Sequence, residues 1–344
     1  MTEKKIMKLL VTGGAGFIGS NFIRYYLETH PDDQIVNLDK LTYAGHIEST
    51  LDFADNPNYK FIKGDIVKEN DTEEAMAGVD IVVHFAAESH VDRSVLNPLE
   101  FVKTNVLGTA QLLQTALKNK IKRFHHISTD EVFGSLSPTD PEFSEQTKYD
   151  PRTPYSASKA GSDHMVRAYS ETYGLPITIT NCANNFGPYH EPEKLFPRFI
   201  TNLLQDKKVP LMGKGENIRE WLYAKDHAAA IDLVFQKGVV GETYCVGGES
   251  KTNLEATKLI LKFLNKDESF IEYVPDRLGH DFRYAIDDSK LRQLGWKPEH
   301  TFEEWLEKTV QWYKDNEAWW KPLLDSRLNV DRKMQESMRY DAAK

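Results

Sequence analysis

Hydrophobic and polar positions in the first half of the chain follow two alternating periods. Short β-rich apolar runs, each typical of a buried strand, cover residues 7–13, 34–39, 59–65, 79–87, 122–129 and 176–182. Stretches with apolar residues at helical spacing lie between these runs, at residues 17–30, 99–120 and 155–174. Strands that alternate with long helices are typical of parallel sheets with right-handed crossovers. The pattern therefore predicts an α/β fold with a doubly wound parallel sheet.

The pattern changes after the sixth of these runs. The segment NNFGPYHEPEK (184–194) contains Gly187, Pro188 and Pro192 and is typical of a loop, and shorter helical and strand-like runs follow it. At 344 residues the chain also exceeds the size at which a single core stops growing, so we expect two lobes. Residues 304–324 are predicted to form a final amphipathic helix. The predicted division is a main lobe at 1–183, a smaller lobe mainly at 184–324 and a charged tail at 325–344.

Composition and charge exclude several classes of function. The net charge of −9 argues against a nucleic-acid partner, which needs a basic face. No stretch approaches the roughly 18 apolar residues that span a bilayer, and Lys8 interrupts the N-terminal apolar run before a signal-peptide core is complete. The two cysteines, Cys182 and Cys245, are too few and too far apart for a structural zinc site and suit a reducing compartment. We therefore expect a cytoplasmic protein with no membrane partner and no metal.

A glycine-rich segment, TGGAGFIG (12–19), joins the first predicted strand to the first predicted helix. Glycines at Gly13, Gly16 and Gly19 permit a tight turn and the close approach of a pyrophosphate to the helix N-terminus, as in Rossmann-type folds. Asp39 ends the next strand, where a carboxylate accepts hydrogen bonds from a ribose diol and repels a 2′-phosphate. The combination predicts a dinucleotide site that favours NAD over NADP.

Two neighbours of this predicted site have ambiguous roles. Lys40 directly follows Asp39, and a basic side chain at that point can tolerate the extra phosphate of NADP. Asp65 ends the third predicted strand, where it either reaches the adenine of the dinucleotide or caps the following helix. The sequence leaves both alternatives open.

Tyr155 and Lys159, in the segment YSASK, lie four residues apart in a predicted helix and therefore share one face of it. A lysine charge beside a phenol favours the phenolate and lowers a pKa that starts at about 10. Such a phenolate can remove a proton from a substrate hydroxyl while a hydride leaves the same carbon for a nicotinamide. The spacing alone is weak evidence, but this helix follows a strand that ends in Ser128 and Thr129, downstream of the dinucleotide motif. We therefore interpret the pair as catalytic.

Together, these motifs resemble those of the extended short-chain dehydrogenase/reductases that act on nucleotide sugars. At a closer level the chain is similar to the dTDP-glucose 4,6-dehydratases over about residues 7–324. The resemblance is carried by HFAAESHVDRS (84–94), STDEVFG (128–134), NNFGPYHEPEKL (184–195), ENIREWLYAKDH (216–227) and RLGHDFRYAID (277–287). It implies an NAD-dependent lyase that converts dTDP-glucose to dTDP-4-keto-6-deoxyglucose by internal hydride transfer, within deoxysugar biosynthesis of the rhamnose type.

The adjacent carboxyl groups of Asp130 and Glu131 gain a role from this resemblance. Oxidation at C4 of the hexose makes a ketone that acidifies the hydrogen on C5, and elimination then needs a base at C5 and an acid at the hydroxyl that leaves C6. The resemblance implies that Asp130 is the acid, that Glu131 is the base and that Thr129 hydrogen-bonds the C4 oxygen. Close like charges raise one of two pKa values, which helps to keep one carboxyl protonated. The plain alternative is a solvated turn.

The resemblance also implies which residues bind the cofactor and the substrate. The implied cofactor-binding residues are Gly13, Gly16, Phe17, Ile18, Gly19, Asp39, Lys40, Asp65, Ile66, Ala86, Ala87, Ser128, Tyr155 and Lys159. The implied substrate-binding residues are Ser89, His90, Asn184, Glu193, Lys194, Arg219, Asn253, Arg277 and His280. Arginine and lysine side chains supply charge-assisted donors for phosphate, so we expect a basic pocket inside an acidic protein.

Four positions depart from the usual pattern of the family. Phe133 and Phe186 stand where tyrosine is frequent, Leu278 where proline is expected and Phe282 where arginine is expected. These departures leave the nucleotide base of the substrate open.

Three alternatives remain beside the dehydratase acting on dTDP-glucose: a dehydratase acting on another nucleotide, a 4-epimerase or decarboxylase of the same fold, and a non-catalytic dinucleotide sensor. Sister epimerases need no acidic pair, so Asp130 and Glu131 favour the dehydratase. Tyr155 and Lys159 argue against the sensor, which has no use for an activated tyrosine. The resemblance further implies a homodimer in which the helices at 99–120 and 155–174 pair with those of a second copy through apolar outward faces.

Overall fold

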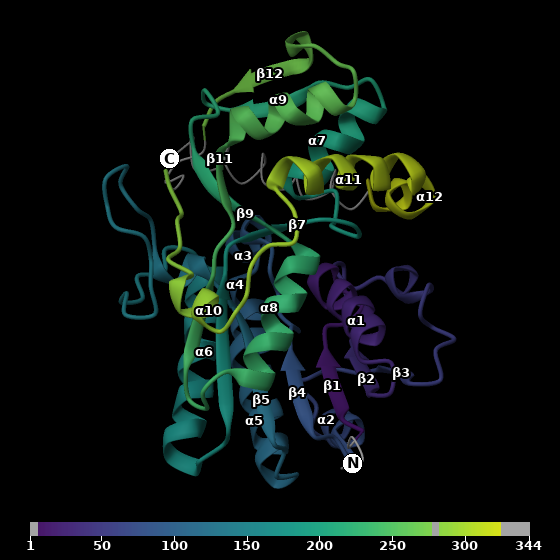
Figure 1. The fold of residues 1–344 in the computed structure, drawn as a ribbon, viewed down its shortest axis with the longest axis vertical. Helices are drawn as coiled ribbons and strands as arrows, with labels where there is room; N and C mark the ends of the chain where they lie inside the picture. Colours follow the sequence, from purple (N-terminus) through teal and green to yellow (C-terminus); the bar gives the residue numbers. More distant parts are fainter. Residues whose placement is uncertain (1–5, 277–281, 325–344) are drawn as a thin grey trace.

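A seven-stranded parallel sheet forms the centre of the larger lobe in the computed structural model, which describes residues 6–276 and 282–324 (Figure 1). Every pairing between neighbouring strands of this sheet is parallel. In spatial order the strands are β10 (Thr243–Val246), β6 (Ile177–Cys182), β5 (Arg123–Thr129), β4 (Ile81–His84), β1 (Lys8–Thr12), β2 (Gln34–Asp39) and β3 (Tyr59–Lys63). The order reverses between β1 and β4, which confirms the predicted doubly wound sheet.

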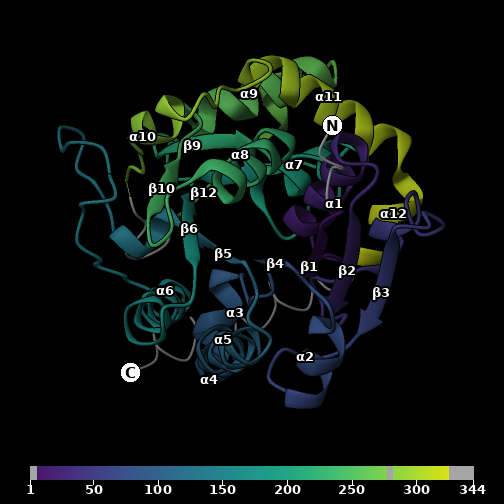
Figure 2. The same ribbon diagram turned by 60° about the horizontal axis from the view of Figure 1, so that its bottom comes forward.

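Helices cover both faces of this sheet because successive residues of each strand point to opposite sides. In β1, Leu9 and Val11 pack against α1 and α8, whereas Leu10 packs against the side of α2, α5 and α6. Figure 2 shows these two helical layers with the sheet between them. The helices and helical turns of this lobe are α1 (Phe17–Thr29), η1 (Ile47–Thr50), α2 (Glu69–Met76), α3 (Val91–Leu96), α4 (Pro98–Phe101), η2 (Val102–Gly108), α5 (Thr109–Lys118), η3 (Asp130–Phe133), α6 (Pro154–Tyr173) and α8 (Ala224–Lys237).

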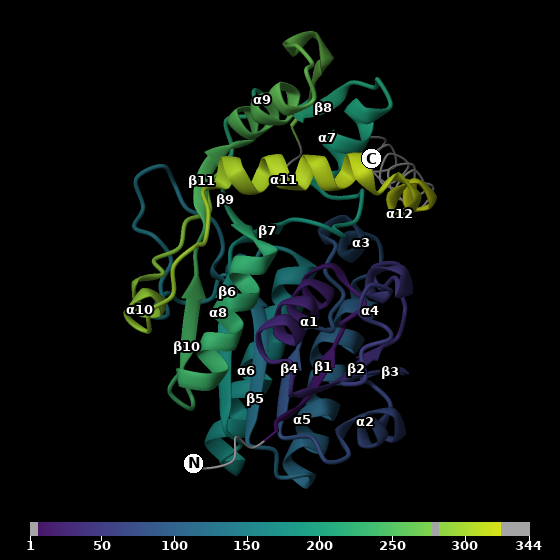
Figure 3. The same ribbon diagram turned by 45° about the vertical axis from the view of Figure 1, so that its right-hand side comes forward.

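The smaller lobe lies beyond the carboxyl ends of the parallel strands (Figure 3). It contains a three-stranded sheet, a two-stranded sheet and a core rich in aromatic side chains. Its elements are β7 (Asn184–Phe186), α7 (Leu195–Leu204), β8 (Val209–Met212), β9 (Ile218–Tyr223), β11 (Glu249–Thr252), α9 (Asn253–Phe263), η4 (Glu268–Phe270), β12 (Ile271–Val274), α11 (Phe302–Asp315), α12 (Glu317–Trp320) and η5 (Lys321–Leu323). The short helix α10 (Ser289–Gln293) instead packs against β10 of the larger lobe. None of the helices in the described part of the chain combines the length and the apolar character needed to cross a membrane.

The chain passes between the lobes more than once. After β7 and β9 in the smaller lobe it returns through α8 and β10, and β10 pairs with β6 as the edge strand of the large sheet. The predicted division at residue 183 stays a prediction, and the topology adds that both α8 and β10 lie with the larger lobe.

Two predicted helices differ in detail from the observed ones. The predicted continuous helix at 304–324 is wrong, because α11 ends at Asp315 and Asn316 separates it from α12. The predicted helix at 99–120 is observed as helical throughout residues 98–118, but its middle turn, η2, has π-helical hydrogen bonding. Such π-helical turns often lie at functional sites.

Candidate active site

A cavity of about 750 Å³ lies at the carboxyl ends of the parallel strands and extends to the smaller lobe. Ligands of doubly wound folds bind in this position, beside the reversal of strand order. All fourteen residues predicted for the cofactor line it, from Gly13 to Lys159. Seven predicted substrate-binding residues also line it, namely Ser89, His90, Asn184, Glu193, Lys194, Arg219 and Asn253. Arg277 and His280, the remaining two, lie outside the described residues.

The glycine-rich loop is shaped so that only glycine fits at key positions. Gly13 has φ of +75°, and a Cβ there would lie 2.7 Å from the backbone nitrogen of Ala86. A Cβ on Gly19 would collide with the carbonyl oxygen of Gly13. The helix α1 begins at Phe17, directly after this turn, so its N-terminus faces the cavity that these residues line. The loop and the helix start therefore fit a pyrophosphate.

Asp39, at the end of β2, and its neighbour Lys40 also line the cavity. The buried Asp39 carboxylate accepts hydrogen bonds from the backbone N–H of Ala15 at 2.9 Å and of Leu41 at 2.8 Å. Burial raises the pKa of this carboxyl, although the two N–H groups oppose the shift. The Lys40 Nζ lies 2.9 Å from Asp65 Oδ2, so the charge of Lys40 is paired. The paired lysine weakens the case for a 2′-phosphate and favours NAD.

The alternative role considered for Asp65, a helix cap, is wrong. The helix α2 begins at Glu69 with Lys68 as its N-cap residue. Asp65 Oδ1 instead accepts a hydrogen bond of 3.1 Å from the Val67 N–H, which closes a turn before the helix. Asp65 lines the cavity, and its contact with adenine remains a prediction.

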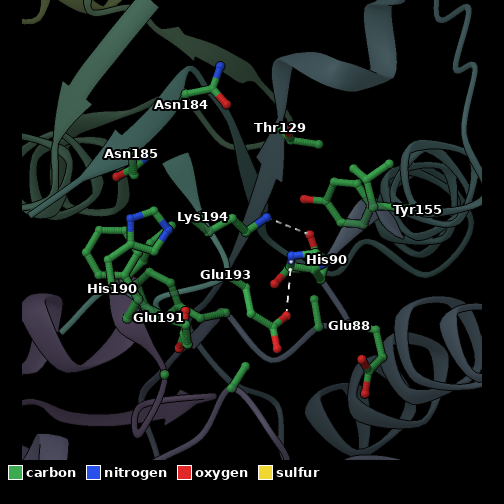
Figure 4. A pocket seen from close by; sticks show the side chains of 18 of the residues that line it. Glu88, His90, Thr129, Tyr155, Asn184, Asn185, His190, Glu191, Glu193 and Lys194 are labelled. Carbon is green, nitrogen blue, oxygen red and sulfur yellow. Dashed lines mark hydrogen bonds and ion pairs between the residues drawn. The ribbon is translucent and has the colours of Figure 1, made fainter. Parts of the chain in front are cut away.

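The catalytic pair lies at the start of α6. Pro154 begins this helix, and Thr153 caps it by accepting a hydrogen bond from the Ser156 N–H. Tyr155 is 9% exposed and lines the cavity together with Lys159, whose Nζ donates a hydrogen bond of 2.7 Å to the Ile127 carbonyl. Figure 4 shows the Tyr155 hydroxyl directed into the space in front of Thr129 and Lys194. The helix start thus places the phenol at the cavity wall.

The pKa of Tyr155 differs from the expectation drawn from its spacing to Lys159. Burial, followed by the negative charge of Glu131, raises the pKa of Tyr155 well above its usual value, although a hydrogen bond with Thr129 opposes the shift. Burial also lowers the pKa of Lys159 below its usual value. The expected lowering of the phenol pKa is therefore wrong for the protein alone, because burial and the charge of Glu131 raise the pKa and the Lys159 ammonium donates to a backbone carbonyl.

Asp130 and Glu131 follow Thr129 in the 3₁₀ turn η3, at the carboxyl end of β5. The Thr129 side chain caps this turn by accepting a hydrogen bond of 3.3 Å from the Glu131 N–H. Glu131 and Thr129 line the cavity, whereas Asp130 is 1% exposed and lies behind its wall. Burial, then Glu131 and Glu220, raises the pKa of Asp130 well above its usual range. The two adjacent carboxyl groups therefore have different environments, with Asp130 favoured in its protonated form.

The substrate side of the cavity is charged and already organised by ion pairs. The Glu193 carboxylate accepts hydrogen bonds from Arg93 and lies 3.3 Å from His90 Nε2. The Lys194 Nζ donates to the Ser89 carbonyl at 3.4 Å, and Lys194 is the N-cap residue of α7 (Figure 4). Lysine at a helix N-terminus is a favourable combination for phosphate.

Sequence reasoning missed Asn105, which lies in the π-helical turn η2. Its side chain accepts a hydrogen bond from the Glu88 N–H at 2.8 Å and donates to the Glu88 carbonyl at 3.0 Å and to Ser158 Oγ at 2.8 Å. It therefore fastens the loop after β4 to the catalytic helix α6. A buried asparagine in the middle of an apolar helical pattern was the available signal.

His190 and Glu191 were also missed, although both line the cavity. The His190 ring stacks on Phe17 at a centroid separation of 4.1 Å, so this loop lies across the start of α1. Burial raises the pKa of Glu191 to about 7. Their loop was recognised in the sequence by its proline and glycine content, but its position over α1 is a tertiary contact.

Of the four departures from the family pattern, the three that the structure describes, Phe133, Phe186 and Phe282, do not line the cavity. Phe133 packs against Phe143 and Tyr149, and Phe186 packs against Phe196 and Tyr223. Both phenylalanines belong to hydrophobic clusters of the described chain. Phe282 is partly exposed, and Leu278 lies outside the described residues. Among the described side chains, no group of three His, Cys, Asp or Glu residues is placed to hold a metal ion.

Comparison with known proteins places the chain among nucleotide-sugar enzymes. A family described as GDP-mannose 4,6 dehydratase matches residues 10–309. The dTDP-glucose 4,6-dehydratase of Neisseria meningitidis serogroup B is 49% identical, over 94% of this chain and 98% of the relative. The protein of the same name from Mycobacterium tuberculosis H37Rv is 47% identical, over 93% of this chain and 97% of the relative.

Solved structures give the same result. DesIV of Streptomyces venezuelae, a dTDP-glucose 4,6-dehydratase with NAD and TYD bound, superposes with a TM-score of 0.89 at 47% identity, covering 92% of this chain and all of that one. The UDP-glucose 4-epimerase of Thermotoga maritima, with UDP-glucose, has a TM-score of 0.83 at 29% identity, covering 90% of this chain and 99% of that one.

The fold, the glycine-rich loop and the Tyr155–Lys159 pair define a dinucleotide-dependent enzyme of the extended short-chain dehydrogenase/reductase class. Within that class, the chain belongs to the family of dTDP-glucose 4,6-dehydratases.

Proposed function

We propose that this chain is an NAD-dependent dTDP-glucose 4,6-dehydratase, a hydro-lyase that forms dTDP-4-keto-6-deoxyglucose. The observation that carries this proposal is the acidic pair at the end of β5. Glu131 lines the cavity beside Tyr155, and Asp130 is buried next to it with a raised pKa. An elimination that needs one base and one acid on adjacent carbons matches two adjacent carboxyl groups in different protonation states.

In the first step we assign Tyr155 as the base that removes the proton from the C4 hydroxyl. Thr129 is within hydrogen-bonding reach of the phenol and would hold the C4 oxygen as it becomes a carbonyl. Lys159 faces the same cavity and contributes a positive charge that favours the phenolate. When bound, NAD supplies a hydride acceptor with a positively charged ring, and its reduced form supplies the hydride that completes C6.

In the elimination step, Glu131 removes the proton from C5 and Asp130 protonates the hydroxyl that leaves C6. The raised pKa of Asp130 keeps its proton available near neutral pH. Because Asp130 is 1% exposed, we propose that its side chain turns toward the cavity before it gives its proton to the substrate.

The described residues fit the cofactor independently of any similarity. The glycine-rich loop provides a cradle that a Cβ would fill, and the α1 N-terminus faces it. Asp39 and the paired Lys40 favour a ribose diol over a 2′-phosphate. These residues would hold the NAD pyrophosphate and adenosine half, and Ser128, Tyr155 and Lys159 would lie at its nicotinamide end.

For the nucleotide half of the substrate, the supporting residues come from the smaller lobe. Lys194 at the start of α7 is suited to one phosphate group. Arg219 and Asn253 are both buried and line the same cavity. We propose that Lys194 and Arg219 neutralise the pyrophosphate, with Asn184 and Asn253 hydrogen-bonding beside them, and that thymine is the base.

We further propose a homodimer formed by α4, η2, α5 and α6. Large apolar side chains are exposed along α4 and η2, including Leu99 at 78%, Val102 at 50% and Leu107 at 55%. Such a row of exposed apolar residues is typical of an interface. We also propose that the enzyme is cytoplasmic and that its product enters deoxysugar biosynthesis of the rhamnose type.

The test is incubation of the purified protein with dTDP-glucose, followed by the alkali-sensitive absorbance of the ketosugar. UDP-glucose and GDP-mannose in parallel reactions report the nucleotide preference. Product from dTDP-glucose at least tenfold faster than from the other two supports the proposal. Conversion of UDP-glucose to UDP-galactose without ketosugar would instead identify a 4-epimerase.

A further inference from the structure

A buried carboxylate lies one turn beyond the catalytic lysine, outside the set of residues that line the cavity. Asp163 is fully buried within α6, and its Oδ2 accepts hydrogen bonds from Ser128 Oγ at 2.7 Å and from the Tyr149 hydroxyl at 2.8 Å. Its Oδ1 lies 3.1 Å from His126 Nε2. One carboxylate thus contacts two residues of β5, the strand that ends in the catalytic Thr129 and leads into η3 with the acidic pair.

Helical spacing connects this carboxylate to the catalytic residues. Tyr155, Lys159 and Asp163 are each four residues apart and therefore lie on one face of α6. Lys159 donates to the carbonyl of Ile127, between the two β5 residues that Asp163 contacts. Asn181 on β6 extends the arrangement, because its Nδ2 donates to the Thr129 carbonyl at 3.1 Å. The helix and the strand that hold the reacting groups are thereby joined through Asp163.

The charge of Asp163 acts on Lys159 as well. Burial lowers the pKa of the Lys159 ammonium, and the nearby Asp163 carboxylate is the largest influence that opposes this. Burial raises the pKa of Asp163 itself, but hydrogen bonding with His126 and Ser128 and the charge of Lys159 together outweigh burial, so the net shift of the pKa is downward and Asp163 stays ionised. His126 has its pKa lowered to about 4 by burial and by Lys159, so its ring is neutral near pH 7 and Asp163 supplies the negative charge.

We infer that Asp163 is a positioning residue for the proposed reaction, which keeps Lys159 charged and holds the end of β5 in register with Tyr155. The inference rests on the proposed function and deepens it. The other titratable or charged groups around Lys159 and Asp163 are His84 on β4, His126 on β5, Tyr149 in the loop before α6, Tyr155 and Arg167 on α6, and Cys182 on β6.

The sign of the expected pH effect follows from the charge. Removing a negative charge beside a buried cation destabilises the protonated lysine, so the pKa of Lys159 falls. A carboxylate close to a cation typically shifts its pKa by about 1–3 units. Since Lys159 is useful only when charged, the alkaline limb of the turnover profile should move to lower pH by a shift of that order.

The experiment compares wild type with Asp163→Asn in the full-length protein, using dTDP-glucose turnover from acid to alkaline pH. We expect the alkaline limb of Asp163→Asn to lie about 1–3 pH units lower, with the KM for dTDP-glucose unchanged, because Asp163 does not line the cavity in the described structure. Asp163→Glu restores the charge and should return the limb toward the wild-type position. Asp163→Ser, which is smaller and also uncharged, should reproduce the shift of the alkaline limb. It replaces Asp163→Asn in the test if that variant does not fold.

Tyr149→Phe is the matched control, because it removes one hydrogen bond to the same carboxylate and keeps the charge. Its alkaline limb should coincide with that of wild type. The inference would be overturned if both uncharged variants lost turnover equally at every pH, with the alkaline limb unmoved. It would also be overturned if their pH profiles coincided with that of wild type. Wild-type turnover of dTDP-glucose in the same series keeps the two questions apart, since its absence would refute the proposed function itself.

Discussion

Asp130 and Glu131 are adjacent in the chain but occupy opposite sides of the cavity wall. Glu131 lines the cavity, whereas Asp130 is 1% exposed and its Oδ2 has no hydrogen-bond partner among the described residues. Oδ1 accepts a single hydrogen bond of 3.3 Å from Thr129 Oγ1, and a buried, ionised carboxylate with so few partners is unfavourable, so Asp130 favours the protonated form. In the turn η3, Glu131 therefore faces the cavity as the base, and Asp130 lies buried behind it as the acid.

This asymmetry predicts that the two carboxyl variants block elimination without blocking oxidation. Asp130→Asn and Glu131→Gln should still reduce bound NAD when dTDP-glucose is added, because Tyr155 performs that step. Product should form ~10²–10⁴-fold more slowly, which is the usual effect of losing a positioned acid or base. Stopped-flow absorbance of NADH in a single turnover, beside product formation, measures both steps.

Exchange at C5 separates the two variants from each other. Glu131→Gln should slow the uptake of solvent deuterium at C5, because the base acts there, and Asp130→Asn should slow it less. If both variants dehydrate at the wild-type rate, the pair is only a turn and the epimerase alternative gains.

Tyr155→Phe should abolish oxidation at C4 and leave ligand binding intact. The substitution removes the hydroxyl that accepts the C4 proton but keeps the ring that forms the cavity wall. We expect turnover to fall by at least ~10²-fold, with Kd values for NAD and dTDP-glucose within a few-fold of wild type. Calorimetric titration with each ligand provides the binding control. Near-normal turnover would show that another group is the base.

The ion pair between Lys40 and Asp65 predicts how the enzyme chooses its dinucleotide. Asp65→Asn leaves the lysine charge without its 2.9 Å partner, so the variant should bind NADP better relative to NAD. Because Lys40 is partly exposed, the change should not exceed about fivefold, in line with ~0.2–1 kcal/mol for such pairs. Glu100→Gln is the matched control, since Glu100 lies farther from Lys40, at 3.9 Å. Equal effects of both substitutions, or a stronger preference for NAD in Asp65→Asn, would contradict this account.

The exposed leucines predict the oligomeric state. Leu107→Asp places a charge in the proposed dimer interface, where desolvation of the carboxylate is unfavourable, so the variant should sediment as a monomer at micromolar concentration. Leu51→Asp is the control, because Leu51 is exposed to a similar degree, at 63%, and lies near η1 outside the proposed interface. A wild-type protein that is already monomeric at this concentration would refute the interface.

Much of the larger lobe was predictable because its strands and helices follow from the pattern of apolar residues within each segment. Apolar runs and helical periodicity located β1 to β6, α1 and α6, and α6 ends where Gly174 adopts φ of 70°. The return of β10 to the large sheet was not predictable, since its pairing with β6 is a tertiary contact between short apolar segments. The break at Asn316 could not be predicted for a similar reason. The apolar periodicity continues past Asn316 into α12, where Trp320 is buried in the core.

For the site, residue types were easier to predict than their surroundings. The sequence brought Tyr155, Lys159 and the acidic pair to one place, and the structure puts all but Asp130 on the cavity wall. The protonation states were less accessible, because the pKa of Tyr155 depends on burial and on Glu131, and not on helical spacing alone. The roles of Asn105 and Asp163 could not be predicted from the sequence, since each acts through contacts with strands or loops that are distant along the chain.

The central claim is that this chain moves a hydride from C4 to C6 of one hexose while it eliminates water. The most direct measurement uses dTDP-glucose with deuterium at C4, incubated with the enzyme in ordinary water and analysed by NMR. We expect the deuterium to appear at C6 of a 4-keto-6-deoxy sugar and to be absent from C5. Deuterium that remains at C4 of an epimerised hexose, or that is lost without a ketosugar, would contradict the central claim.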